Sequence, residues 1–412
     1  MRVVVTGMGI ISPIGNDIRT YWKNLVGGVC GITKIEDPLY DELPSKVWGL
    51  VKDFNPDEFG IEPAMARKQD KFALYAIAAA KQAVDQSGIV SGENVDPSRF
   101  GVYFGSGIGG FETIRRDSVK MENDGPKWVS PHFVPTMIPN IAAGHIAIRN
   151  NAQGPCFSIS TACATGTHCI GEAYRAIKHG YADVIITGGA EAPCVPMSVA
   201  AFGNMKALTK ETDPLRASLP FNVDRGGFVL AEGAGALVLE SYNHAVKRGA
   251  TILAEVCGFG STCDAYHVTA PRPDGSTQAA AVKAALKEAG YCGRRDVLHI
   301  NSHGTGTPLN DSSETNAFHI ALGRNAGKAI INSTKSMTGH MLGAAGAAEA
   351  IAAILALREG VVPPTIGLDR QDPVCDLNYT PLKAVKAPLT IAVSDSLGFG
   401  GHNSCVAFRK VE

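Results

Sequence analysis

Short apolar runs alternate with longer amphipathic stretches along the whole chain. The runs are rich in β-branched residues and predict buried strands at 2–6, 101–104, 184–187, 236–239, 297–300, 329–331 and 391–393. Apolar residues at helical spacing predict helices at 71–86, 163–180, 276–289 and 343–357, each followed within a few residues by Gly or Pro. This alternation predicts an α/β protein in which helices cover sheets.

The length of the chain predicts two structural halves. At 412 residues, the chain is longer than a typical domain with a single hydrophobic core. A strand, a loop of small residues and a reactive side chain follow one another at Cys163 and again at His303. We therefore expect an N-terminal half at 1–250 with the cysteine, and a C-terminal half at 251–412 with His303 and His340. No low-complexity linker lies between them, so one compact body is predicted.

Composition excludes several classes of protein. With 38 basic and 39 acidic residues, no global charge favours nucleic acid or a membrane surface. Ten cysteines include no C-x-x-C pair, and no secretory signal is visible, which favours a reducing cytoplasm and no structural zinc. The most apolar helix, 344–357, contains Glu349 and is too short to span a bilayer.

Glycine adds a second pattern to the hydrophobic one. The chain has 46 glycines, and they cluster at 105–110, 188–189 and 398–401. Glycine permits tight turns and close backbone approach. We therefore expect these clusters to form turns packed closely around a site.

Cys163 is the leading candidate nucleophile. It lies in the small-residue run 158–168, at the start of the amphipathic stretch that ends at Gly180. The amide groups and positive dipole end at a helix N-terminus favour a thiolate and can stabilise a negative oxygen. The alternative is a buried cysteine that only packs.

Two histidines stand in glycine-rich surroundings that resemble a site. His303 precedes Gly304-Thr-Gly-Thr-Pro308, and His340 precedes a helix of small residues. Neither has a second ligand at zinc-binding spacing, so a metal site is disfavoured. Either one alone could be a structural histidine, but the presence of Cys163 and Lys335 favours catalysis.

Four ordered motifs resemble the elongating β-ketoacyl-acyl-carrier-protein synthases. They are Thr161-Ala-Cys-Ala-Thr-Gly, Asn301-Ser-His-Gly-Thr-Gly-Thr-Pro, Ser333-Thr-Lys-Ser-Met-Thr-Gly-His and Gly398-Phe-Gly-Gly. The resemblance runs from Met1 essentially to the C-terminus. It implies the thiolase fold, a duplicated αβαβα five-layer sandwich, in a homodimer without a cofactor or functional metal.

The resemblance also implies how the residues act. Cys163 would take an acyl chain from acyl carrier protein, and malonyl-carrier protein would then lose carbon dioxide. His303 and His340 would stabilise the resulting enolate. The backbone N–H groups of Cys163 and Phe399 would hold the tetrahedral oxygen.

Further roles carried over from the family each have a structural alternative. Lys335 would order the network of catalytic residues through its charge, or form only a salt bridge. Thr305 and Thr307 would hold the malonyl arm, or cap a turn.

The acyl pocket would involve four apolar residues that could equally be core, one of them reaching the neighbouring subunit: Ile108, Phe202, Leu342 and, across the dimer, Phe133. Four basic residues would form the surface that binds the carrier protein, and their alternative is an ordinary solvent-exposed charged face: Arg67, Lys68, Lys71 and Lys206. Glu349, Asn301 and Ser394 match a buried polar network that sometimes surrounds a monovalent cation in the family.

Three residues depart from the family pattern near the C-terminus. Asp395 replaces a usual Asn, Leu397 a usual Phe, and His402 a usual Thr, which places an ionisable group near the malonyl side. These changes bear on gating and substrate choice. Fatty acid elongation is the main hypothesis, and a type II polyketide or polyene ketosynthase is the alternative. A non-catalytic chain-length partner, a cysteine hydrolase and coenzyme A as acyl donor are weaker alternatives.

Overall fold

The structure is a computed structural model that describes residues 1–36 and 40–411. Its strands form two five-stranded half-sheets with the same pairing pattern. The first half-sheet has the order β5 (Cys156–Phe157), β4 (Phe100–Gly105), β6 (Val184–Glu191), β7 (Gly233–Ser241) and β1 (Val3–Ile11). The second has the order β10 (Ile330–Asn332), β9 (Leu298–Asn301), β13 (Ile391–Gly398), β14 (His402–Arg409) and β8 (Ala254–Cys263).

The pairing repeats from one half to the other. In each half the three outermost strands are parallel and the remaining pairs are antiparallel. The halves join where β1 pairs with β8, with Val3 opposite Val256, so that one ten-stranded sheet results. The predicted division near residue 250 falls between α9 (Tyr242–Lys247) and β8, and remains a prediction.

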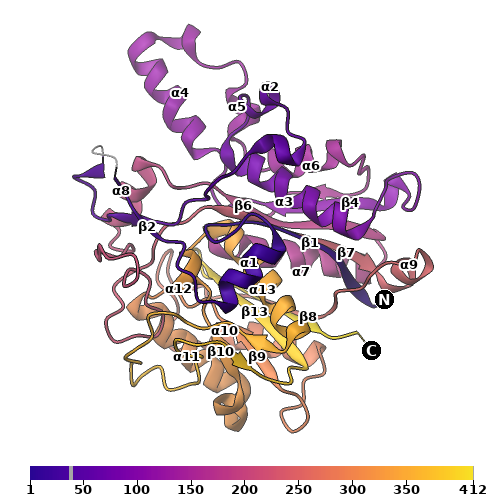
Figure 1. The fold of residues 1–412 in the computed structure, drawn as a ribbon, viewed down its shortest axis with the longest axis vertical. Coiled ribbons are helices and arrows are strands. Elements are labelled where there is room, and N and C mark those ends of the chain that lie inside the picture. The colour runs from indigo at the N-terminus through magenta and orange to yellow at the C-terminus, as the bar shows by residue number, and fades with distance from the viewer. Residues whose placement is uncertain (37–39, 412) are drawn as a thin grey trace.

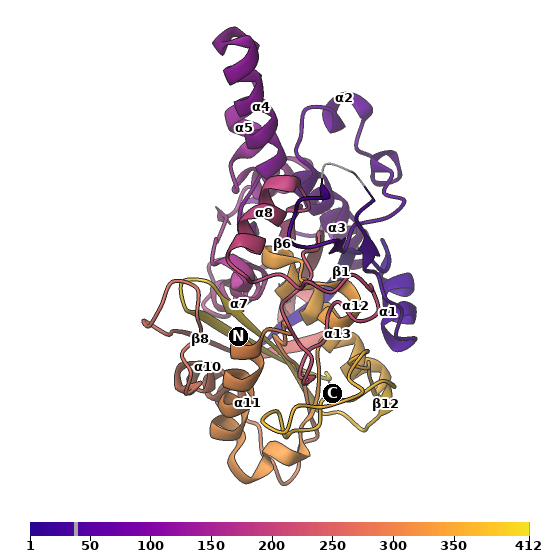
Figure 2. The same ribbon diagram turned by 90° about the vertical axis from the view of Figure 1, so that its left-hand side faces the viewer.

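Helices form three layers around the two half-sheets, as Figures 1 and 2 show. The outer layer on the first half contains α3 (Lys71–Ser87) and α6 (Ile141–Arg149), and the outer layer on the second contains α10 (Ser276–Glu288) and α11 (Pro308–Leu322). Between the half-sheets lie α7 (Thr165–Lys178) and α13 (Ala345–Glu359). The predicted five-layer αβαβα sandwich is therefore confirmed.

The remaining elements are short or peripheral. Helix α4 (Phe111–Asp124) projects from the top of the molecule in both views, with α5 (Phe133–Met137) beside it. The others are α1 (Ile18–Val26), α2 (Pro63–Ala66), α8 (Pro196–Asn204), α12 (Lys335–Thr338) and the paired strands β2 (Thr33–Lys34) with β3 (Val47–Trp48) and β11 (Val361–Val362) with β12 (Val385–Lys386). Across the described part of the chain, no helix is both long and apolar enough to cross a membrane.

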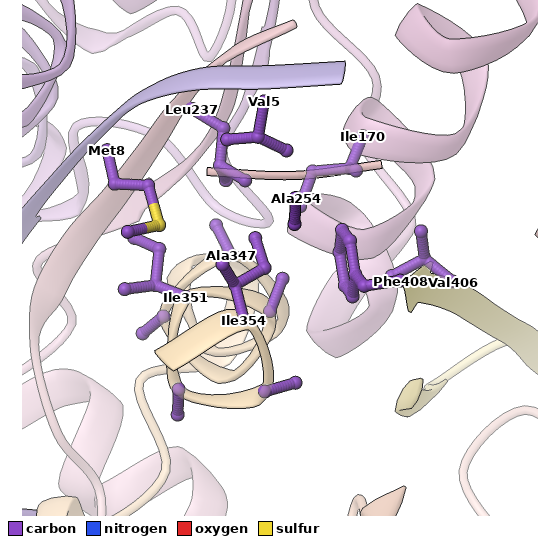
Figure 3. Packing of buried hydrophobic residues seen from close by; sticks show 14 of the residues in the cluster. Val5, Met8, Ile170, Leu237, Ala254, Ala347, Ile351, Ile354, Val406 and Phe408 are labelled. Atoms are coloured by element: carbon purple, nitrogen blue, oxygen red, sulfur yellow. The ribbon is translucent and has the colours of Figure 1, made fainter. Parts of the chain in front are cut away.

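Helix α13 lies in the core and is buried on every side from Ala345 to Leu357. Figure 3 shows Ile351 and Ile354 of this helix facing strand residues such as Val5 and Phe408. Alanines at most other positions keep the helix narrow enough to fit between two sheets. This burial on both faces explains why the stretch is apolar throughout instead of amphipathic.

Two glycine predictions are wrong for the same physical reason. The first strand, predicted at 2–6, continues through Gly7 to Ile11, and Gly188, predicted in a turn, lies inside β6. A Cβ atom at Gly7 would lie 1.9 Å from the carbonyl oxygen of Ala83 in α3, and one at Gly188 would lie 2.0 Å from that of Gly235 in β7. These glycines therefore permit close backbone packing within the sheet layers.

Candidate active site

A cavity of about 300 Å³ lies where the two halves meet. It collects most of the predicted site residues: Cys163, His303, His340, Phe399, Thr305, Thr307, Phe202, Leu342 and Lys206. Ile108 does not line it but packs in the apolar cluster that contains Cys163 and Leu342. The exposed Arg67, Lys68 and Lys71 lie outside the lining, as does the half-buried Phe133 on α5.

Two similar segments, each a 3₁₀ turn followed by a helix, contribute residues to the cavity. A 3₁₀ turn at Ala162–Ala164 leads into α7, and another at Leu342–Ala344 leads into α13. The first residue of each turn has a positive φ, 50° at Ala162 and 45° at Leu342. Non-glycine residues rarely adopt this conformation, which is concentrated at functional sites. Both turns carry residues that line the cavity.

Cys163 lies in the first of these turns, directly before α7, with 9% of its surface exposed. Its own backbone N–H and that of Phe399 form hydrogen bonds toward Sγ and lower the thiol pKa. Gly398 lets Phe399 come this close, since a Cβ atom there would lie 2.4 Å from the carbonyl oxygen of Thr161. Two N–H donors aimed at one atom are the arrangement of an oxyanion hole.

The expected preference for a thiolate is not found in the resting site. Burial raises the pKa of the Cys163 thiol to about 12, although the charge of Lys335 and the two N–H groups act in the opposite direction. Loss of water around the sulfur outweighs the donors at the helix start. The resting nucleophile is therefore a neutral thiol.

His303 follows β9 and contacts a buried ion pair. Lys335 Nζ lies 3.5 Å from His303 Nδ1 and forms a salt bridge with Glu349 of α13. Lys335 and Glu349 are at most 2% exposed. Because an ammonium only donates, Nδ1 accepts and the ring proton resides on Nε2.

His340 lies close to His303 and in a similar environment. The two ring centroids are 5.3 Å apart at an interplanar angle of 84°, and Phe228 packs 5.2 Å from His340 on another side. Burial and the charge of Lys335 lower the pKa of both histidines well below the usual value. Both rings are therefore neutral and can donate a hydrogen bond without carrying a charge.

Two acids of α11 hold the glycine-rich loop that follows His303. The carboxylate of Glu314 accepts from the backbone N–H groups of His303 at 2.6 Å and Gly304 at 2.8 Å. Asp311 accepts from the N–H of Gly306 at 3.2 Å. The hydroxyls of Thr305 and Thr307 lie 3.0 Å apart. The loop is fixed by carboxylates that motif matching did not single out.

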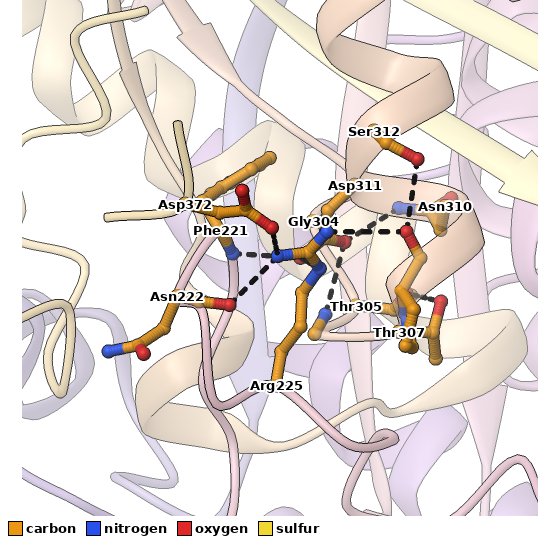
Figure 4. Close-up of polar contacts among 12 residues, drawn as sticks. Phe221, Asn222, Arg225, Gly304, Thr305, Thr307, Asn310, Asp311, Ser312 and Asp372 are labelled. Atoms are coloured by element: carbon orange, nitrogen blue, oxygen red, sulfur yellow. Dashed lines mark hydrogen bonds and ion pairs between the residues drawn. The ribbon is translucent and has the colours of Figure 1, made fainter. Parts of the chain in front are cut away.

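Asp311 is itself held by a buried arginine. Figure 4 shows Arg225 between Asp311, Asn222 and Asp372. Its guanidinium donates to the Asn222 carbonyl at 2.8 Å and to Asp372 at 2.6 Å, and its Nε lies 3.8 Å from Asp311. Arg225, Asn222 and Asp372 lie far from His303 in the sequence, so only the folded structure shows that they support the loop.

Glu191 was also missed by sequence reasoning. It ends β6, is wholly buried, and accepts from the Ser106 hydroxyl and from the N–H groups of Gly107, Ile108 and Gly343. One carboxylate thus ties the loop of Ile108 to the turn that follows His340. A lone Glu after an apolar run carries no sequence signal for this role.

The three departures from the family pattern lie at different depths. Leu397 lines the cavity, and Asp395 is wholly buried behind it. His402 is not among the lining residues, and its ring lies 6.3 Å from that of His168. Among the described residues, no cluster of three or more His, Cys, Asp or Glu could hold a metal ion.

Together, the layers and the cavity define a ketosynthase with the thiolase-type fold. Residues 1–245 match the beta-ketoacyl synthase N-terminal domain and residues 253–369 the C-terminal domain. The chain therefore belongs to the beta-ketoacyl synthase family.

Two relatives match this chain in sequence over its whole length. It is 45% identical to 3-oxoacyl-[acyl-carrier-protein] synthase 2 of Staphylococcus aureus (strain MRSA252), over 100% of this chain and 99% of that protein. It is 43% identical to the protein of that name from Synechocystis, covering 100% and 98%.

Solved structures agree with the fold at lower identity. A beta-ketoacyl synthase from Burkholderia phymatum STM815 superposes with a TM-score of 0.92 at 33% identity, covering 100% of both chains. A type II polyketide ketosynthase in complex with its acyl-carrier protein gives 0.92 at 33% identity, covering 100% of this chain and 99% of that one.

Proposed function

We propose that this protein is a 3-oxoacyl-[acyl-carrier-protein] synthase that elongates acyl chains by two carbons in fatty acid synthesis. The observation that carries the proposal is the single cavity that holds a cysteine, two neutral histidines and two converging backbone N–H groups. The similarity to two proteins of this name over their whole length gives independent support.

In the first half-reaction, Cys163 Sγ attacks the thioester carbonyl of acyl-carrier protein. The oxygen becomes negative and accepts from the N–H groups of Cys163 and Phe399, which in the resting site are directed at Sγ beside it. The carrier thiolate then leaves and takes up the proton that the Cys163 thiol loses. Because the resting thiol is neutral, its ionisation accompanies attack instead of preceding it.

In the second half-reaction, malonyl-carrier protein loses carbon dioxide, and the bonding electrons form an enolate. His303 Nε2–H and His340 donate to the enolate oxygen, and neutral imidazoles suit this task because no proton has to be removed from carbon. The carbanion attacks the Cys163 thioester, and the Cys163 thiolate leaves and takes up a proton from solvent, the one proton that decarboxylation makes the reaction consume. Thr305 and Thr307 hold the malonyl arm, and Lys335 fixes the His303 tautomer.

The remaining assignments concern the chain and its partners. Phe202 and Leu342 line the acyl pocket, Ile108 packs against the apolar cluster beside it, and Phe133 of a second subunit completes the pocket in a homodimer. The acidic carrier protein docks on Arg67, Lys68, Lys71 and Lys206, and Lys206 is exposed at the cavity. We prefer carrier protein to coenzyme A as the acyl donor because an acidic carrier protein is complementary in charge to these basic residues. All ten cysteines are free, which supports a cytoplasmic location.

A type II polyketide or polyene ketosynthase is the second candidate. Two observations favour considering it: Leu397 places an aliphatic side chain in the cavity wall where the family pattern has Phe, and a polyketide ketosynthase superposes closely. The mechanism would be unchanged and only the acyl chain would differ. A chain-length partner subunit is disfavoured because Cys163, His303 and His340 share the cavity.

The test combines intact-mass measurement with a panel of acyl-carrier proteins. We expect an acyl adduct that Cys163→Ala abolishes, and its conversion by malonyl-carrier protein to a β-keto product two carbons longer. Preference for saturated chains supports fatty acid elongation, whereas preference for poly-β-keto or polyene chains supports the second candidate. Release of free acid alone would indicate a hydrolase, and no adduct with any donor would refute the proposal.

A further inference from the structure

We propose that Asp395 and Glu314 hold one proton between them, that Asp395 carries it, and that this proton keeps the His303 loop in its active position. Asp395 is thus a positioning residue that acts through Glu314. The inference rests on the proposed condensing function, and it concerns one of the positions where this chain departs from the family pattern.

Charge counting in the buried region behind His303 requires such a proton. Glu314, Glu349 and Asp395 are each at most 2% exposed, and so is Lys335, the cation whose charge acts on Asp395. Three carboxylates and one ammonium would bury two net negative charges. Isolated buried charges are so costly that one group neutralises instead. Asp311 does not offset this charge, because its neighbouring cation, Arg225, also pairs with Asp372.

Hydrogen bonding identifies Asp395 as the neutral acid. Glu349 forms the salt bridge with Lys335, and both oxygens of Glu314 accept from backbone N–H groups. Asp395 Oδ2 accepts from the Gln278 amide at 2.6 Å, but Oδ1 is buried without a partner. An unsolvated carboxylate oxygen is unfavourable there, whereas a carboxylic acid is much less so.

Burial weakens both acids, so the hydrogen bonds decide which of them carries the proton. Burial raises the pKa of Asp395 to about 7, helped by the charge of Glu349 and opposed by Gln278, Lys335 and the N–H of Ser396. Burial and the charge of Asp395 raise the pKa of Glu314 well above its usual value, and the N–H groups of Gly304 and His303 act in the opposite direction. Two interacting acids release their protons as a pair, and the hydrogen bonds favour the ionised form of Glu314.

The effect on His303 follows from the position of Glu314. Below about pH 7, a neutral Asp395 leaves the Glu314 carboxylate bound to the N–H groups of His303 and Gly304. Above it, a second carboxylate repels Glu314 and loosens this turn. Cys405, the other titratable group facing Asp395, stays a neutral thiol because its pKa is raised well above the usual value. Condensation therefore slows as pH rises through neutrality.

The test measures the condensation step alone. Isolated acyl-enzyme is mixed with malonyl-carrier protein in single turnovers between about pH 5.5 and about pH 9, so that ionisation of Cys163 does not contribute. We expect the rate to fall by up to about tenfold per pH unit above about pH 7. In Asp395→Asn, an uncharged isostere, this fall is expected to disappear. Glu240→Gln, a buried carboxylate far from the site that pairs with Arg248, is the matched control and keeps the wild-type profile.

A second pair of measurements separates the two acids from each other and from the proposed function. Glu314→Gln turns one amide donor toward a backbone N–H and is expected to slow condensation by about tenfold or more at every pH. The infrared C=O band of a buried carboxylic acid at about pH 6 is expected to vanish in Asp395→Asn. An alkaline fall that persists in Asp395→Asn, or a band that vanishes only in Glu314→Gln, overturns the assignment. The infrared band needs no turnover, so it tests the proton even if condensation fails.

Discussion

The ammonium of Lys335 lies 3.5 Å from Nδ1 of His303 and forms a salt bridge with Glu349. This contact fixes the His303 tautomer, because Nδ1 can only accept from an ammonium and the ring proton remains on Nε2. The same positive charge helps to lower the pKa values of His303 and His340. One buried lysine thus fixes the tautomer of His303 and, together with burial, keeps both candidate enolate donors neutral.

Replacing Lys335 by Met is expected to separate its structural role from its catalytic role. The change leaves Glu349 buried without a counter-ion and is expected to cost about 3–5 kcal/mol of unfolding free energy, measured in urea. The double variant Lys335→Met/Glu349→Met removes both charges and is expected to regain most of that stability but not the condensation rate. Recovery of the rate in the double variant would assign Lys335 a purely structural role.

Both site histidines are expected to stay neutral in mildly acidic solution. Burial and Lys335 lower the pKa of each, so protonation occurs only well below the usual range. Nitrogen-15 NMR of labelled protein, with His303→Ala and His340→Ala for assignment, is expected to show neutral rings at about pH 6 while free histidine in the same buffer titrates. A charged ring at that pH would contradict the neutral-donor mechanism.

The reactivity of Cys163 is expected to rise continuously with pH. Its thiol pKa is about 12, so the thiolate fraction grows about tenfold per pH unit through the neutral and mildly alkaline range. The measurement is the rate of alkylation by iodoacetamide, followed by mass spectrometry, with Cys163→Ser to subtract other cysteines. A plateau near neutral pH would show that the helix N-terminus outweighs burial.

A side chain at Gly398 is expected to disrupt the oxyanion hole while the fold is retained. The Cβ atom of Gly398→Ala would lie 2.4 Å from the Thr161 carbonyl oxygen, so the Phe399 N–H must move away from Cys163. Loss of one such donor costs about 10²–10³ in rate, which acyl-transfer kinetics would measure. Gly144→Ala is the matched control, since its Cβ meets no atom within 4 Å. Equal rates in both variants would exclude the Phe399 donor.

Hydrophobic patterning predicted most of the fold. The seven predicted strands and the main helices are present, because their apolar residues repeat at spacings that only one local structure can bury. Of the ten strands in the central sheet, the two-residue β5 was missed because it is too short to show a pattern, and the longer β8 and β14 were also missed. Their sequences contain Gly, Ser, Thr or Asn, and some of these polar groups are satisfied by contacts from distant residues, as where Asn403 donates to Asp264 at 2.7 Å. Such a contact does not exist until the sheet forms.

The sequence by itself determined which reactive side chains are present and the short motifs around them. Cys163, His303 and His340 stand in local patterns whose small residues are required by the turns they occupy, so the candidate chemistry was readable before folding. Tertiary structure decided the protonation states. The neutral thiol, the neutral imidazoles and the raised pKa of Asp395 all result mainly from burial, which the charge of Lys335 reinforces at the two histidines and opposes at Cys163 and Asp395. Desolvation depends on segments far apart in the chain, and no local pattern encodes it.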